Sequence, residues 1–201
     1  SMGEALVIFG ALLIGFPLPL LAVQIIWLNL VTDGFLTVAM GMEPKEEGLL
    51  SARFERPSKY LIDGLMVWRM VLMALPMMVG TLYLFAANTG GDLTKAWTIS
   101  LTVLAVFQWF NAWNCRSATE SIFRTNPFSN LYLVGATSIV IVLQLLAVYA
   151  PFPQKILHTT ALSLSEWALI ILIALTVILV EELRKMFVRA SNMLSRTQTV
   201  Y

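Results

Sequence analysis

The sequence is poor in cysteine, histidine and charge. Among 201 residues it has one cysteine, Cys115, and one histidine, His158. An internal disulfide and a zinc site built from cysteines and histidines of this chain alone are therefore excluded. Only 12% of the residues are charged and the formal net charge is +1 at pH 7, so no basic field attracts nucleic acid. A metal ion bound here would need oxygen ligands.

Motifs of ATP chemistry are also missing. Phosphoryl transfer needs a phosphate-binding loop or a phosphorylatable aspartate in a soluble domain. The sequence has no glycine-rich loop ending in Lys-Ser or Lys-Thr, and it has no Asp-Lys-Thr-Gly segment. We therefore expect no catalytic residue and no cofactor-binding residue in this chain alone.

Apolar residues, in contrast, are abundant and lie in long runs. They make up 58% of the chain, whereas a soluble domain has about 45–50%. A hydrocarbon core about 30 Å thick requires about 20 apolar residues per helix. The sequence therefore predicts an all-α membrane protein, a bundle of six transmembrane helices. Two lie within 1–42 with a turn at Pro17 and Pro19, and the others cover 70–91, 96–115, 125–154 and about 163–183.

The two ends of the chain carry further expectations. The opening Ser-Met-Gly-Glu is typical of a helix interior and no cleavage site of a signal peptide follows it, so we expect a truncated first helix. Lys and Arg near helix ends stay on the cytoplasmic side, and with six spans only Lys95 and Lys155 face the other way. The N-terminal end, the 43–63 loop and the C-terminal tail are then cytoplasmic, and we expect a multi-pass protein of the plasma membrane.

Asp33 is the clearest polar residue inside a predicted span. An ionisable residue within a membrane helix is costly and therefore a functional candidate. Asn29 precedes Asp33 by four residues and Thr32 lies three beyond Asn29, so the three share one face of a helix. Their oxygens suit a hard cation such as Ca²⁺ or an alkali ion, and Gly34 favours an unwound turn that frees carbonyls. In the alternative reading, Asp33 marks an interfacial helix end that faces water.

Two further groups of polar residues each allow two interpretations. Glu4 is either a second carboxylate ligand or a helix-start glutamate favoured by the macrodipole. Gln108, Asn111 and Asn114 recur every three residues between Trp109 and Trp113. These amides either line a site or hydrogen-bond neighbouring helices.

Several segments resemble a known family of membrane proteins. Pro17-Leu-Pro-Leu20, the undecapeptide Gln24-Ile-Ile-Trp-Leu-Asn-Leu-Val-Thr-Asp-Gly34 and Met40-Gly-Met-Glu-Pro44 closely resemble the sixth membrane helix of P-type cation-transporting ATPases of the calcium-pump type. Gly3-Glu4 with the following Ala-Leu-Val-Ile resembles the middle of their fifth helix, and Asn111-Ala-Trp-Asn114 resembles their eighth. The resemblance covers the chain as helices five to ten of the membrane region, a part of an ATP-hydrolysing enzyme.

The resemblance implies a set of cation ligands. Asn29, Thr32 and Asp33 would be those of the sixth helix and Glu4 that of the fifth. Ser1 stands where an asparagine ligand is usual, and Gln108 stands where the eighth helix usually has a glutamate. Since the second change removes a charge, a single divalent ion or monovalent ions with proton exchange would fit the two remaining carboxylates. We expect Ca²⁺ as the transported cation, with Mn²⁺, Na⁺ or K⁺ as alternatives.

The resemblance also implies an organisation and partners. Residues 1–42 would be the ion-binding helix pair, 43–63 a cytoplasmic loop, 64–186 a four-helix scaffold and 187–201 a cytoplasmic tail. ATP and Mg²⁺ would bind only to the parent pump, whose other membrane helices and cytoplasmic domains are partners together with the lipid bilayer. Phosphorylation there would drive alternating access around Asp33. The rival hypothesis is a free-standing six-helix membrane protein, either a secondary carrier or a non-transporting assembly subunit.

Overall fold

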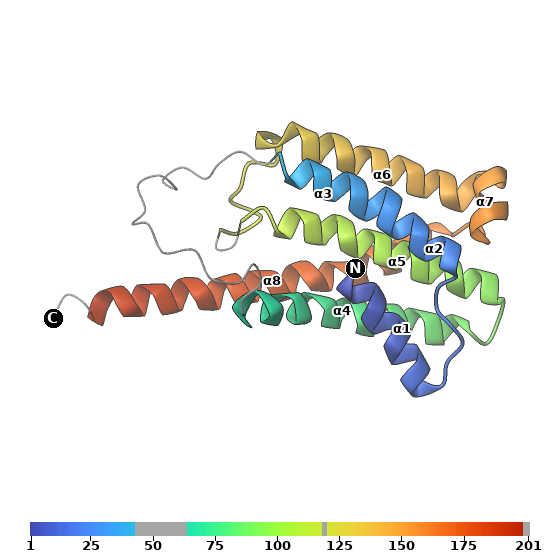
Figure 1. The fold of residues 1–201 in the computed structure, drawn as a ribbon, viewed down its shortest axis with the longest axis horizontal. Helices are drawn as coiled ribbons and strands as arrows, with labels where there is room; N and C mark the ends of the chain where they lie inside the picture. Colours follow the sequence, from blue (N-terminus) through green and yellow to red (C-terminus); the bar gives the residue numbers. More distant parts are fainter. Residues whose placement is uncertain (43–63, 118–119, 199–201) are drawn as a thin grey trace.

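The described part of the chain is helical throughout. A computed structural model describes residues 1–42, 64–117 and 120–198, except for the side chains of Leu65 and residues 192–198. Figure 1 shows a bundle of roughly aligned helices with no strand in these ranges. In chain order the helices are α1 (Met2–Ile14), α2 (Ala22–Trp27), the π-helix η1 (Leu28–Asp33), α3 (Gly34–Met40), α4 (Gly64–Asn88), α5 (Leu93–Asn114), the 3-10 turn η2 (Pro127–Ser129), α6 (Leu131–Tyr149), α7 (Pro151–Leu157) and α8 (Leu164–Gln198).

The N-terminal helix pair forms as the sequence predicts. Gly15 ends α1 in the left-handed conformation, with φ of 78°, which costs glycine little because it has no Cβ. The proline-containing turn follows, and α2, η1 and α3 then form one continuous 19-residue helical segment from Ala22 to Met40. The sequence suggested an unwound turn at Gly34. The structure instead has a continuous helix there, which is widened into a π-helix just before Gly34, over Leu28–Asp33.

Six segments build the bundle, and α5 is its central helix. In the described residues, four segments are long and apolar enough to cross a membrane, namely Ala22–Met40, Met66–Asn88, Leu131–Tyr149 and Leu164–Ser191. α5 adds 22 residues and α1 adds 13, so the six predicted segments are present. α5 lies between the upper helices α3 and α6 and the lower helices α4 and α8 in Figure 1. A helix surrounded by protein tolerates buried polar residues such as Thr98, Ser100 and Thr102.

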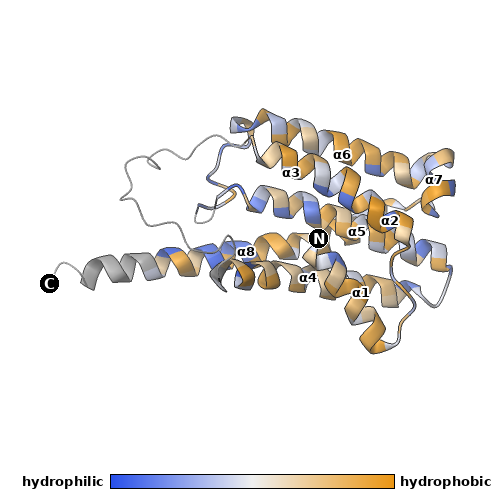
Figure 2. Ribbon diagram, viewed as in Figure 1, coloured by the Kyte–Doolittle hydropathy of each residue, from blue (hydrophilic) through white to orange (hydrophobic). Residues whose placement is uncertain are grey.

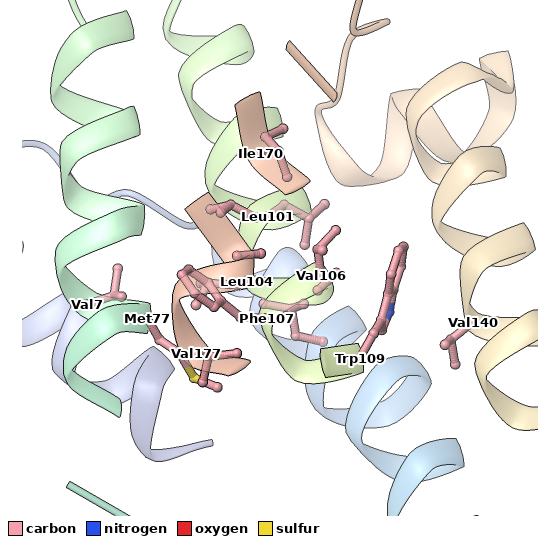
Figure 3. Close-up of a cluster of buried hydrophobic side chains, with 14 of the residues drawn as sticks. Val7, Met77, Leu101, Leu104, Val106, Phe107, Trp109, Val140, Ile170 and Val177 are labelled. Atoms are coloured by element: carbon pink, nitrogen blue, oxygen red, sulfur yellow. The ribbon is translucent and has the colours of Figure 1, made fainter. Parts of the chain in front are cut away.

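The hydrophobic core follows α5 along the bundle. Phe107 and Leu104 of α5 are fully buried, and Val177 of α8, Met77 of α4 and Val7 of α1 belong to the same cluster (Figure 3). Large apolar side chains also cover the outside, for example Leu13 at 72% exposure and Leu30 at 71%. Figure 2 shows apolar residues along the length of most helices. A surface of this kind is suited to lipid.

Glycines bring α1 close to α4. A Cβ added to Gly3 would lie 2.7 Å from Sδ of Met77, and one added to Gly10 would lie 2.9 Å from Cδ1 of Leu82. Small residues at helix contacts allow backbones to approach closely in membranes. This packing holds α1, and with it Glu4, against the scaffold.

Several boundaries differ from those expected from the sequence. α4 begins at Gly64, before the predicted apolar run 70–91, and it includes Arg69, whose ion-pair partner is Glu181. α8 continues to Gln198, beyond the predicted apolar run of about 163–183, and the cytoplasmic tail at 187–201 stays a prediction. The short helix α7 was not expected, and the 43–63 loop lies outside the described residues.

Candidate functional site

Four of the six candidate ligands meet around the carboxylate of Glu4. Glu4 lies in the first turn of α1 and is 3% exposed. Its Oε2 accepts a hydrogen bond from Nδ2 of Asn29 at 2.7 Å. Its Oε1 accepts one from Nε2 of Gln108, also at 2.7 Å, and Nε2 of Gln108 lies 3.4 Å from Oγ of Ser1. Residues from α1, η1 and α5 therefore form one polar centre inside an apolar bundle.

Three side-chain oxygens of this centre lie near one another, around the backbone nitrogen of Ser1. The backbone N–H group of Ser1 lies 3.2 Å from Oδ1 of Asn29 and 3.2 Å from Oε2 of Glu4. Oδ2 of Asp33 lies 3.8 Å from the same group. Two carboxylates and an amide oxygen therefore lie close together, and oxygens of this kind are the ligands that hard cations take.

The π-helix η1 sets the direction of the sixth-helix candidates. The backbone N–H of Gly34 bonds to the carbonyl of Asn29, five residues earlier, which is the hydrogen bond of a π-helix. Because a π-helix holds more residues per turn than an α-helix, Asn29 and Asp33 remain on one side while Thr32 turns further away. Isolated π-helical turns are frequent at functional sites, so η1 coincides with the residues singled out from the sequence.

Thr32 is the candidate that the structure does not bring to the others. Its side chain is 2% exposed, yet within the described ranges no hydrogen bond joins it to Glu4, Asn29, Asp33, Gln108 or Ser1. The assumption that Thr32 shares a face with Asn29 rested on α-helical spacing. Its role as a ligand stays a prediction.

A cavity of about 340 Å³ adjoins the centre between α1, α3, α4 and α5. Polar groups in its wall come from Ser1, Asp33, Thr37, Arg69, Gln108 and Asn111, and most of the remaining lining is apolar. The side chain of Asp33 is 31% exposed, so this carboxylate faces the cavity and is not sealed in the core. The alternative was that Asp33 marks an interfacial helix end that faces water; in the structure the helix continues beyond Asp33 to Met40.

Two amide oxygens at the cavity lack partners. Oε1 of Gln108 and Oδ1 of Asn111 are buried and accept no hydrogen bond from any residue that the structure describes. Nδ2 of Asn114, the third amide of this helix face, donates to the carbonyl of Val177 in α8 at 3.2 Å. Gln108 therefore belongs to the polar centre, whereas Asn114 connects two helices, which is the other reading that its spacing allowed.

The centre contains few acidic groups. Over residues 1–42, 64–117 and 120–198, no group of three or more His, Cys, Asp or Glu side chains is arranged to hold a metal ion. The cluster around Glu4 combines two carboxylates with amide and hydroxyl oxygens, which is the donor chemistry of hard cations rather than of zinc.

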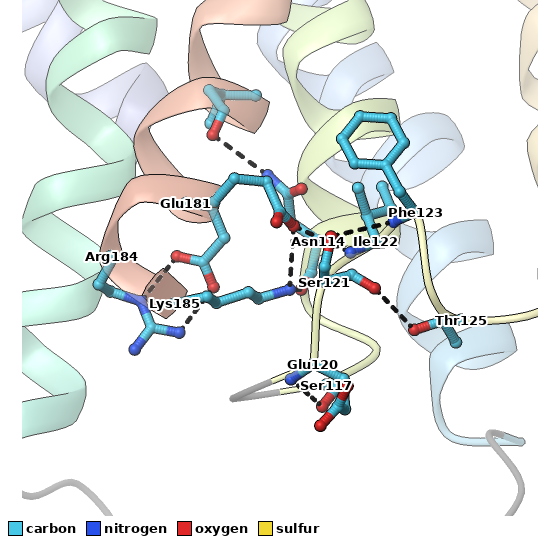
Figure 4. A network of polar contacts seen from close by, with 12 residues as sticks. Asn114, Ser117, Glu120, Ser121, Ile122, Phe123, Thr125, Glu181, Arg184 and Lys185 are labelled. Atoms are coloured by element: carbon cyan, nitrogen blue, oxygen red, sulfur yellow. Dashed lines mark hydrogen bonds and ion pairs between the residues drawn. The ribbon is translucent and has the colours of Figure 1, made fainter. Parts of the chain in front are cut away.

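A second polar cluster lies at the C-terminal end of α5, less than two turns beyond Gln108, where α5 meets α8 (Figure 4). Glu181 is 0% exposed and pairs with Arg69 of α4 at 2.5 Å and with Nε of Arg184 at 2.8 Å. Nζ of Lys185 donates to the carbonyl of Asn114 at 3.1 Å, which caps the C-terminal end of α5. Because its carboxylate is already paired with two arginines, Glu181 is a structural residue rather than a cation ligand.

The sequence interpretation missed a buried amide on α6. Gln144 is 1% exposed, and it bonds both Trp27 of α2 and Thr102 of α5. It lies in an apolar run without a polar neighbour at helical spacing. Gln144 could have been found from the sequence, because a single amide within a membrane span requires a hydrogen-bond partner.

The fold and the polar centre define an α-helical membrane module with an oxygen-lined site between its helices. The family model described as "Cation transporting ATPase, C-terminus" matches residues 17–187. The chain belongs to this family.

Three curated relatives illustrate the similarity. A calcium-transporting ATPase of Bacillus subtilis is 36% identical over 85% of this chain and 19% of its own length. Calcium-transporting ATPase 1 of Saccharomyces cerevisiae is 32% identical over 88% and 19%. A probable cation-transporting ATPase F of Mycobacterium tuberculosis is 30% identical over 90% and 20%. The chain thus spans about a fifth of the length of these relatives.

Proposed function

We propose that this chain is the ion-binding and translocation module of an ATP-driven cation pump and that Ca²⁺ is its cargo. The observation that carries the proposal is the meeting of Glu4, Asn29, Asp33 and Gln108, from three helices, at one polar centre beside a cavity inside the bundle. Two carboxylates match the charge of one divalent ion. The names of the relatives support calcium, and Mn²⁺, Na⁺ and K⁺ are the alternatives that the test includes.

Cation binding at this centre requires the amides to turn. Asn29 and Gln108 direct their NH₂ groups at Glu4, and an NH₂ group cannot coordinate a cation. Rotation about the terminal torsion, which has two broad and roughly equivalent positions, presents the amide oxygens instead. Oε1 of Gln108 has no described partner to lose in that rotation. The centre can therefore exchange amide hydrogen bonds for oxygen–cation contacts without a change of backbone.

Transport would follow from a difference in cation affinity between two arrangements of the helices. A ligand shifts an equilibrium only if it binds the two states differently. η1 is the element suited to such a change, because its widened turn carries Asn29 and Asp33. Phosphorylation in the cytoplasmic domains of the parent pump, with ATP and Mg²⁺, would shift η1 and alternate the access to Asp33.

The distribution of basic residues supports one orientation in the plasma membrane. Six described basic residues lie at the end of the bundle where α4 begins and α5 and α8 leave it: Arg69, Arg116, Arg124, Arg184, Lys185 and Arg189. Lys95, at the start of α5, and Lys155, on α7, lie at the opposite end. By the positive-inside rule the first end is cytoplasmic, together with the 43–63 loop and the tail. Ser1 itself lies at the polar centre within the bundle.

The test replaces Asp33 by Asn in the full-length pump. Cation-dependent phosphorylation from ATP should need at least about tenfold more cation, because a charged ligand contributes more than 1.5 kcal/mol. Asp92→Asn is the matched control, since Asp92 caps α5 at the opposite end and asparagine caps equally well. Unchanged cation dependence in Asp33→Asn would remove Asp33 from the site.

The DNA sequence upstream of this segment distinguishes a pump module from a free-standing membrane protein. A pump predicts an open reading frame that continues upstream into an Asp-Lys-Thr-Gly segment. A start codon directly before Ser1 would favour a carrier or an assembly subunit. Titration of the full-length protein with Ca²⁺, Mn²⁺, Na⁺ and K⁺ then identifies the cation that activates it.

A further inference from the structure

A single buried amide connects the two helical segments that carry most of the candidate ligands. Oε1 of Gln144 accepts a hydrogen bond from Nε1 of Trp27 at 3.1 Å. Its Nε2 donates to Oγ1 of Thr102 at 3.2 Å. Because an indole N–H can only donate, the amide oxygen must face Trp27, and the NH₂ group must face α5. Both ends of the amide are therefore used.

The two partners stand next to the ligand-bearing turns. Trp27 is the last residue of α2 and directly precedes η1, which holds Asn29 and Asp33. Thr102 lies six residues before Gln108 on α5, about 9 Å along the helix axis. Gln144 belongs to α6, which supplies none of the six candidate ligands, so it acts on the site only through these neighbours.

The side chains around Gln144 are apolar, so an amide at this position calls for an explanation. On the same face of α6, Val140, Ala147 and Val148 are apolar and at most 1% exposed. Burial of an amide among such side chains is unfavourable unless both ends are paired, and a methionine of similar length would fit without that requirement. Hydrogen bonds between membrane helices are individually weak. The amide therefore contributes little stability, and its effect lies in the geometry that it imposes.

That geometry concerns the start of the π-helical turn. A widened turn can begin at more than one residue of a helix, and each choice rotates the following side chains differently. Trp27 is held directly before the turn, and Gln24, one helical turn earlier, donates to the carbonyl of Leu157 at 2.9 Å. With α2 fixed at these two points, the wide turn is confined to Leu28–Asp33.

We propose that Gln144 is a positioning residue of the cation site, which sets the rotation of Asn29 and Asp33 relative to Gln108. This inference depends on the proposed function. Without the Trp27–Gln144–Thr102 contact, α2 and α5 keep their packing but lose their common register, so the ligands meet a cation in a poorer arrangement.

The test is Gln144→Met in the full-length pump. This substitution conserves the length of the side chain and removes both hydrogen bonds. The cation concentration for half-maximal phosphorylation from ATP should rise about fivefold, the factor that one ordinary hydrogen bond represents. The thermal unfolding midpoint and the maximal phosphoenzyme level should remain as in the wild type. Ser138→Ala is the control on the same helix, because its one hydrogen bond among the described residues goes to Val134 of its own helix.

A double-variant cycle connects the effect to the contact. Trp27→Phe removes the indole donor and keeps an aromatic ring. If both residues act through one hydrogen bond, the cation affinity of the double variant should be no lower than that of the more affected single variant. Additive losses of cation affinity would overturn the proposal. An unchanged affinity in Gln144→Met would also overturn it, as would a loss of affinity that parallels a lower unfolding midpoint.

Failure of this proposal can be told from failure of the proposed function. If the wild-type protein shows no cation-activated phosphorylation, the proposed function itself has failed, whereas a wild-type response with an unaffected variant rejects only the role of Gln144.

Discussion

Nε2 of Gln108 donates a hydrogen bond to Oε1 of Glu4 at 2.7 Å, although 104 positions separate the two residues. This contact joins the first turn of α1 to the central helix α5. A buried carboxylate is stable only if its oxygens are paired. Glu4 meets this condition with one amide donor on each oxygen.

Glu4→Gln should weaken cation activation of the full-length pump. The substitution removes a negative charge from the centre while it conserves the volume of the side chain. We expect the cation concentration for half-maximal phosphorylation to rise about 10- to 100-fold, because hydrogen bonds and contacts of a charged group are worth about 1.5–3 kcal/mol.

The control for this variant is Glu166→Gln. Glu166 forms an ion pair with Lys95 at 2.7 Å at the opposite end of the bundle, where the loss of a partly exposed pair has little effect. Equal cation dependence in Glu4→Gln and the wild type would return Glu4 to a purely structural role at the start of α1.

The pattern of the sequence predicts this site only in part. The spacing of Asn29 and Asp33 places both on one helical face, and they do share the centre. The contact between Glu4 and Gln108 depends on how α1 packs beside α5, which no local pattern contains. The π-helix could not be predicted for a similar reason. The residues before it, Gln24 and Trp27, hydrogen-bond to segments far away in the sequence, and a local pattern does not contain these contacts. α-Helical spacing groups Thr32 with the other candidates, but no described hydrogen bond joins it to them, and its role as a ligand stays a prediction.

The fold was easier to predict than the site. Hydrophobic runs give membrane helices directly because the bilayer fixes their length. Boundaries shifted where a charged residue found a partner, as Arg69 does in α4. The central place of α5 follows from its polar residues only after the other helices are arranged around it.

Removal of the carboxylate of Glu181 should destabilise the bundle. Glu181→Leu leaves Arg69 and Arg184 without the acceptor that they share. Loss of one partner of a buried ion pair costs about 3–5 kcal/mol. We expect about 2–3 kcal/mol, because the side chain of Arg69 is 25% exposed and water compensates part of the loss.

Thermal or denaturant unfolding of the purified protein in detergent measures this change. Glu120→Gln is the comparison, because Glu120 is exposed and its described hydrogen bond comes from its backbone N–H. A Glu181→Leu variant as stable as Glu120→Gln would show that the cluster in Figure 4 does not hold α4, α5 and α8 together.

Gly80 and Gly135 should respond oppositely to alanine. A Cβ at Gly80 would lie 2.7 Å from Cγ2 of Ile173 and 3.0 Å from Cζ of Phe107. Overpacking costs about 1–3 kcal/mol, more than the gain of about 1 kcal/mol from helix propensity. A Cβ at Gly135 meets nothing within 4 Å, so Gly135→Ala should be neutral or slightly stabilising.

The same unfolding experiment compares the two glycine variants. Gly80→Ala should unfold at a lower temperature than the wild type, and Gly135→Ala should not. A reversed order would mean that Ile173 and Phe107 move aside without cost, and that the contact between α4 and α5 is looser than the core around Phe107 implies.

Two substitutions at Gln108 distinguish a cation ligand from a hydrogen-bond donor. Leucine has neither an oxygen nor a donor, whereas an ionised glutamate keeps two oxygens but cannot donate to Glu4. If Gln108 supplies an oxygen to the cation, Gln108→Glu should bind the divalent cation at least as tightly as the wild type, while Gln108→Leu should lose about tenfold or more in affinity, the cost of an unreplaced contact to a charge. If Gln108 serves only as the donor that stabilises Glu4, both variants should lose affinity to a similar extent. Cation-activated phosphorylation of the two variants in parallel decides between these roles, since the glutamate variant improves on the leucine variant only when its oxygen reaches the cation.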